Sequence, residues 1–140
     1  MALYIGIDPG VNTGIAVWDS DKREFLTIGT KTILNALFLC KEILYREVPH
    51  IIFEDARQRK WLPRERNNAE YRGKLMGAGS VKRDCEIWEE FCQGYNIPYT
   101  AIPPRKGLTK WTPESFARLT GWKGRTSNHA RDAAMLVFGK

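Results

Sequence analysis

The chain has 140 residues, a size at which we expect a single domain over residues 1–140 with one core. A composition that is 43% hydrophobic and 27% charged excludes a disordered chain, and no stretch reaches the roughly 20 apolar residues of a membrane span. The net charge of +6 indicates an anionic partner without identifying it. Because the N-terminus lacks the pattern of a secretion signal, we expect a cytoplasmic protein without membrane contact.

The first half of the chain predicts a meander of strands followed by a helix and a strand. Short apolar runs alternate with turn residues over 3–8, 13–18 and 23–28, which predicts three antiparallel strands. From Thr32 onward, apolar residues at helical spacing follow a threonine cap and predict a helix. The short, β-branched run of residues 50–53 predicts a buried strand in a βαβ unit.

The second half predicts one long helix, a fifth strand and two short helices. Residues 68–94 form the long helix, and 97–104 the strand. Thr112 with Pro113 begins a short helix, and Ser127 or Asn128 caps a last helix through Phe138. The sum is an α/β fold with a mixed five-stranded sheet flanked by helices. A seam on the long helix packs either on the core or on a second copy of the chain: Ala78, Val81, Cys85, Trp88, Cys92 and Tyr95.

The three cysteines, Cys40, Cys85 and Cys92, predict no metal site. Their number is odd, they lack the spacing of metal ligands, and neither histidine lies near them in the sequence. We therefore expect reduced thiols in the core or at an interface.

The positive charge is concentrated in residues 57–74 and 105–125, each with a net charge of +5. One such run is usually a solvated surface. Because both runs contain tryptophan, Trp61 in the first and Trp111 and Trp122 in the second, they favour contact with a phosphate backbone and stacking on bases. Trp61 could instead belong to the core or to a dimer interface. The candidate DNA-binding residues are Arg57, Arg59, Lys60, Trp61, Arg64, Arg66, Arg72, Lys74, Arg105, Lys106 and Lys110.

Acidic residues stand at the ends of apolar elements in three distant parts of the chain. Asp8 ends the first strand, Glu54 and Asp55 end the strand of residues 50–53, and Asp132 interrupts the last helix. Each alone is explained by a turn, a strand end or a helix cap. Three together are better explained by one site, because clustered carboxylates repel unless a cation such as Mg²⁺ or Mn²⁺ offsets them. Whether Asp55 assists stays open.

His129 lies three residues before Asp132, so both face the same side of the last helix. A histidine at a helix start is usually only solvated. Beside a carboxylate cluster it becomes a candidate metal ligand or a proton acceptor for water.

The segments "IGIDPGVNTGIAVWD", "IIFED" and "HARDAAMLV" closely resemble, in order and separation, the three acidic motifs of RuvC-type Holliday junction resolvases, which have a ribonuclease H-like fold. The resemblance implies that Asp8, Glu54, Asp132 and His129 are catalytic and bind two Mg²⁺ or Mn²⁺ ions. It implies a homodimer that cuts two symmetric strands of a four-way or otherwise branched DNA. The implied reaction is phosphodiester hydrolysis assisted by two metal ions.

Three other functions fit parts of this pattern. Nucleases that process pre-ribosomal RNA are similar in length and first motif, but the position of Glu54 and the spacing of His129 and Asp132 favour the resolvase. The first motif also resembles the phosphate loop of actin-like and sugar-kinase ATPases, which need two such domains. A non-catalytic DNA-binding module is disfavoured, because carboxylates that face DNA weaken binding.

Overall fold

The computed structural model describes residues 2–59, 69–104 and 110–140, and of residues 69–78 it describes the backbone only. The strands are β1 (Leu3–Asp8), β2 (Thr13–Asp19), β3 (Glu24–Lys31), β4 (His50–Glu54) and β5 (Tyr99–Ile102). The helices are α1 (Ile33–Leu44), α2 (Ala69–Gly94), α3 (Pro113–Thr120) and α4 (Asn128–Val137), and the 3₁₀ turn η1 (Ala56–Gln58) follows β4. The predicted elements are therefore present in the predicted order.

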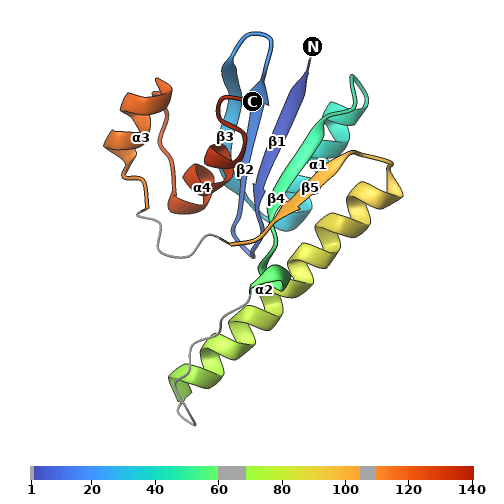
Figure 1. Ribbon diagram of the computed structural model, residues 1–140, viewed down its shortest axis with the longest axis vertical. Helices are drawn as coiled ribbons and strands as arrows, with labels where there is room; N and C mark the ends of the chain where they lie inside the picture. The colour runs from blue at the N-terminus through green and yellow to red at the C-terminus, as the bar shows by residue number, and fades with distance from the viewer. Residues whose placement is uncertain (1, 60–68, 105–109) are drawn as a thin grey trace.

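The strands form one mixed sheet in the order β3-β2-β1-β4-β5 (Figure 1). β1, β2 and β3 pair antiparallel, as the meander predicts, whereas β4 pairs parallel to both β1 and β5. In this order β1 lies beside β4, although more than 40 residues separate the two strands in the sequence. Both strands run in the same direction and end at the same edge of the sheet.

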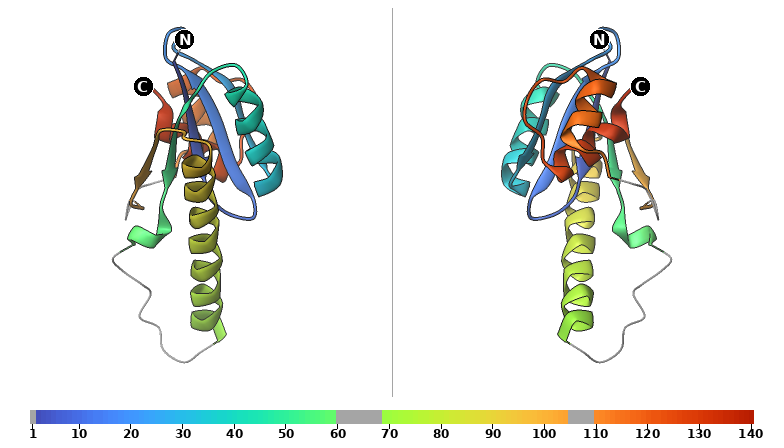
Figure 2. Two further views of the ribbon diagram at one scale, coloured as in Figure 1. Left: turned by 90° about the vertical axis from the view of Figure 1, so that its right-hand side faces the viewer. Right: turned by 90° about the vertical axis from the view of Figure 1, so that its left-hand side faces the viewer.

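Helices cover both faces of the sheet, as the two side views of Figure 2 show. Ile5, Ile7 and Phe53 pack with α1 and α2 on one face. Ala16 and Ile52 pack with α3 and α4 on the other. Because side chains alternate along a strand, neighbouring residues of β1 and β4 belong to opposite layers.

Two glycines bring α4 unusually close to the sheet. A Cβ atom on Gly6 of β1 would overlap the carbonyl of Ala133, and one on Gly14 of β2 would overlap the carbonyl of His129. The helix contributes small buried side chains to the same contact, among them Ala130 and Ala134. The backbone of α4 therefore rests directly on β1 and β2.

Side-chain caps begin the last two helices where the sequence predicts them. Thr112 and Ser115 form a reciprocal capping box at α3, with Ser115 N 3.1 Å from Thr112 Oγ1. Ser127 is the cap of α4, since its Oγ accepts from the Ala130 amide at 3.1 Å. This settles the choice between Ser127 and Asn128.

The predicted seam of α2 packs on the core. Cys85, Trp88 and Cys92 are fully buried and Val81 packs against the same cluster, whereas Tyr95 is 44% exposed. The Ala78 side chain lies outside the described residues. All three cysteines are free and buried, and burial raises the pKa of the Cys40 thiol to about 12. The seam thus belongs to the core, as do the thiols.

Helix α2 also extends far past the sheet, at the edge where β1 and β4 end (Figure 1). Its 26 residues correspond to about 39 Å at 1.5 Å per residue. Among the described side chains of this helix, those of Cys85, Trp88 and Cys92 are buried in the core. No helix in the described ranges is both long enough and apolar enough to cross a membrane.

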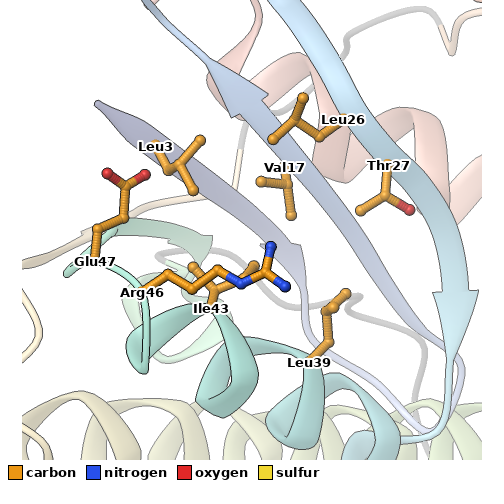
Figure 3. A pocket seen from close by; sticks show the side chains of 8 residues that line it. All are labelled: Leu3, Val17, Leu26, Thr27, Leu39, Ile43, Arg46 and Glu47. Carbon is orange, nitrogen blue, oxygen red and sulfur yellow. The ribbon is translucent and has the colours of Figure 1, made fainter. Parts of the chain in front are cut away.

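An apolar groove of about 270 Å³ lies between α1 and the first three strands (Figure 3). Leu3, Val17, Leu26, Leu39 and Ile43 line it, and charged side chains stand at one end. Leu3 and Val17 belong to the layer beneath α1. The groove is therefore on the face of the sheet opposite to α4.

The contact between Gly14 and α4 gives a test of the fold. We expect Gly14→Ala to lower the free energy of unfolding by about 1 to 3 kcal/mol or more, because the added methyl group meets backbone that cannot rotate away. Gly29→Ala in β3 is the matched control, since nothing lies within 4 Å of a Cβ there. Urea unfolding monitored by tryptophan fluorescence measures both, and equal stability of the two variants would contradict the close approach.

Candidate active site

Asp8 and Glu54 lie together at the carboxyl ends of two neighbouring parallel strands. β1 and β4 pair with Ile7 opposite Phe53, so the residues that follow, Asp8 and Glu54, reach the same edge of the sheet. Ile7 and Phe53 point into the core beneath α1 and α2. By the alternation of side chains, Asp8 and Glu54 face the other side, toward α4.

Helix α4 adds His129 and Asp132 to this edge. Gly14 pairs with Asp8 across β1 and β2 and lies against the backbone of His129. The His129 ring therefore reaches Asp8, with Nδ1 2.9 Å from Oδ2. Asp132, three residues further along α4, accepts a hydrogen bond from Lys110 Nζ at 2.6 Å. The four residues that the sequence predicts as metal ligands thus come from three elements to one end of the sheet.

The acids of this cluster influence one another's protonation. Burial raises the pKa of Asp8 above its usual value, and repulsion by Asp132 adds to it, while the hydrogen bond with His129 acts against it. Burial likewise raises the pKa of Glu54, followed by repulsion from Asp8, while the charge of Lys110 acts against it. The ionised cluster is therefore electrostatically unfavourable, and an added cation would relieve it.

The donor set suits a divalent metal ion. Carboxylate oxygens and one imidazole are ligands that Mg²⁺ and Mn²⁺ accept. As the side chains stand, no group of three or more such ligands among the described residues is arranged around one point. Asp8 is engaged by His129 and Asp132 by Lys110. The chemistry of the residues fits a metal ion, and each of these two contacts uses one oxygen of its carboxylate.

Asp55 points away from this cluster and holds Arg57. The carboxylate accepts from Arg57 Nε at 2.8 Å and from Nη2 at 3.0 Å. The same guanidinium donates to Glu89 of α2 at 3.2 and 3.1 Å. Although burial opposes it, hydrogen bonds from Arg57 and Gln58 hold the pKa of Asp55 below its usual value. Asp55 therefore stabilises the link from η1 to α2, and a phosphate contact of Arg57 stays a prediction.

The other predicted DNA-binding residues are only partly described. Lys110 lies at the acidic cluster, and the charge of Arg59 acts to lower the pKa of Glu54. Trp111 is 37% exposed, whereas Trp122 is partly buried and packs edge-on against Phe25, beside the core cluster of that face. Six of the predicted residues lie outside the described residues: Lys60, Trp61, Arg64, Arg66, Arg105 and Lys106. For two more, Arg72 and Lys74 of α2, only the backbone is described.

Two residues that shape the site are not predicted by the sequence analysis. Gly14 lets His129 reach Asp8, and a glycine inside an apolar strand is a signal of close backbone approach. Glu89 holds Arg57, but it lies 32 residues away on the polar side of a long helix. No local pattern indicates that second contact.

The architecture is similar to that of a solved protein–DNA complex. The chain superposes on "T. thermophilus RuvC in complex with Holliday junction substrate" with a TM-score of 0.57 and 18% sequence identity. The match covers 96% of this chain and 89% of that one. This chain has the ribonuclease H-like fold of RuvC. No protein-family model matches the sequence, and no curated protein does.

The consecutive acids Glu54 and Asp55 should affect stability in opposite directions. At pH 7 we expect Glu54→Gln to raise the melting temperature by a few degrees, because it removes a carboxylate whose pKa is raised. We expect Asp55→Asn to lower the free energy of unfolding by about 1 to 3 kcal/mol, because Arg57 loses a charged partner.

The pH dependence of the two effects follows from the directions of the pKa shifts. The contribution of Asp55 is present above its unfolded pKa and is lost as the pH falls through its lower folded pKa. The cost of ionised Glu54 is absent below its unfolded pKa and is complete only above its raised folded pKa. Melting curves from pH 3 to 8 test this, and effects of the same sign at pH 7 would contradict the assignment of the two acids to opposite roles.

Proposed function

We propose that this chain is a metal-dependent endonuclease that cuts branched DNA, with the Holliday junction as its first candidate substrate. The observation that carries the proposal is the convergence of Asp8, Glu54, His129 and Asp132 at one sheet edge. The neighbour in fold, RuvC, is bound to a Holliday junction substrate. A crossover junction endodeoxyribonuclease needs the kind of carboxylate cluster that this edge carries.

Asp8, Glu54 and Asp132, with His129, are the residues that would hold Mg²⁺ or Mn²⁺, two ions per site. Bound metal ions would supply charge for the phosphate and for the leaving oxygen during phosphodiester hydrolysis. The chain itself supplies a cluster of carboxylates whose ionised state is costly, as the raised pKa values of Asp8 and Glu54 indicate. This cost favours uptake of cations over an empty site.

His129 has a second use besides ligation. Its Nδ1 lies 2.9 Å from Asp8 Oδ2, so a proton on Nδ1 is held by that carboxylate. The other ring nitrogen, Nε2, is then unprotonated and can accept a proton from water. Asp8 thereby orients the ring for general-base work.

The substrate is gripped by the positive segments. Arg59 and Lys110 lie near the acids, and the part of α2 that projects beyond the sheet leaves from the same edge (Figure 1). Most of the other predicted DNA-binding residues lie outside the described residues and stay candidates on their sequence alone. We propose that each basic residue in contact with a phosphate adds to the salt dependence of binding. A homodimer in the cytoplasm would match a two-fold junction with two sites.

The decisive experiment compares cleavage of a synthetic four-way junction with that of linear duplex, with and without Mg²⁺. We expect paired nicks in the junction only with the metal. Asp8→Asn, Glu54→Gln and Asp132→Asn should each lose several orders of magnitude in cleavage and keep the fold and DNA binding, because each removes a charge that holds metal. Glu42→Gln, on the exposed side of α1, is the control for loss of one carboxylate.

Near wild-type cleavage by Asp8→Asn would contradict the assignment of the active site to this acidic cluster. Two further outcomes distinguish the alternatives. Cleavage of a structured RNA in preference to the junction would favour a nuclease of the RNA-processing type. Tight junction binding with no cleavage under any divalent metal would favour a non-catalytic DNA-binding module.

The role of His129 is tested by two substitutions. His129→Ala should lower cleavage at least tenfold, because it removes both a ligand and a proton acceptor. His129→Asp should retain part of the activity, since a carboxylate also binds Mg²⁺ and accepts a proton. Single-turnover rates on the junction measure this, and equal rates for all three forms would restrict His129 to a solvated helix start.

A further inference from the structure

Arg131 is a buried arginine that donates hydrogen bonds to neutral groups. It lies in the first turn of α4 and is 5% exposed. Nε donates to the Trp111 carbonyl at 2.9 Å, and Nη2 donates to Asn128 Oδ1 at 2.6 Å. Nη1 donates to the carbonyl and the hydroxyl of Thr126 at 2.5 and 2.8 Å. Within the described residues, no carboxylate pairs with it.

This position is unfavourable for a positive charge in two respects. A buried ion costs free energy unless it is paired, and a cation in the first turn of a helix opposes the helix dipole. The hydrogen bonds of Arg131 offset these costs. They tie three chain positions together: Trp111, two residues before α3, the loop after α3, and the start of α4.

One of these positions, Trp111, directly follows Lys110, whose ammonium contacts Asp132. The Lys110 side chain is 67% exposed, and exposed ion pairs contribute little to holding a chain in place. The ion pair alone therefore does not explain why Lys110 stays at the acidic cluster. The backbone of the next residue is fixed by Arg131, which is buried.

We propose that Arg131 is a positioning residue that places Lys110 in the candidate active site. It holds the Trp111 carbonyl and Thr126 against α4, which directs Lys110 toward Asp132. The placement itself rests on the contacts above, and only its consequence for cleavage rests on the proposed function. Arg131 lies between His129 and Asp132 in the sequence, but its donors serve the neighbouring loop and not the acids.

The placement is tested without metal or DNA by acetylation of lysines and mass spectrometry. In Arg131→Gln, we expect Lys110 to be acetylated several-fold faster than in the wild type, because its contact with Asp132 is released. Asp132→Asn sets the rate for complete release. Lys22, far from the site in β-turn 20–23, is the internal reference, and Arg46→Gln on the opposite face is the control for loss of an arginine. An unchanged Lys110 rate in Arg131→Gln, alongside a raised rate in Asp132→Asn, would overturn the proposal.

The consequence for cleavage is tested by a double-mutant cycle. We expect Arg131→Gln to lower kcat on the junction about tenfold with KM nearly unchanged, and to have no further effect in a Lys110→Met background. A purely structural role predicts the same loss in both backgrounds, in proportion to lost stability, and would overturn the positioning role. Arg131→Lys keeps the charge but concentrates its donors on one nitrogen, so it should be intermediate in both experiments, which keeps the test valid if Arg131→Gln folds poorly. If the wild type cuts no substrate, the proposed function fails while acetylation still decides the placement.

Discussion

The distance between helix α4 and the sheet determines whether the candidate site exists at all. Gly6 and Gly14 set that distance from the side of the sheet, because each leaves room for a carbonyl of α4. Ala130, Ala133 and Ala134 set it from the side of the helix. A larger side chain at any of these positions would lift the helix and move His129 away from Asp8. Residues without functional groups thus decide the geometry of those that have them.

The two consecutive acids at the end of β4 have different roles, one in the acidic cluster and the other in the contact with Arg57. Glu54 faces α4 and belongs to the acidic cluster, whereas Asp55 faces α2 and binds Arg57. The pleat of the strand produces this division, since consecutive side chains point to opposite faces. One carboxylate is destabilised in its ionised form, and its neighbour is stabilised. Proximity in sequence to a candidate site is therefore no measure of participation in it.

Periodicity predicted the elements and the meeting of the acids, because both depend on local patterns and on the direction of parallel strands. Examples of elements that local patterns predicted are the helix caps at Thr112 and Ser127 and the long helix α2. The contact of Lys110 with Asp132 could not be predicted, since it depends on a loop anchored by Arg131 through backbone carbonyls. The partly buried position of Trp122 was also missed, because composition favoured a stacking role and only the packing against Phe25 shows otherwise. Contacts between loops carry no periodic signal.

The order in which the elements are synthesised constrains when the acidic cluster can form. The sheet from β1 to β4 is complete in the first 54 residues, and it can pair while the rest of the chain is still being made. The acidic cluster needs Asp132, and the C-terminal end is tied back to β2 by a hydrogen bond from Trp18 Nε1 to the Lys140 carbonyl. During synthesis, the face of the sheet that includes Ala16 and Ile52 stays uncovered until α4 emerges. A nascent chain thus exposes an apolar face of the sheet and lacks the complete acidic cluster until α4 docks.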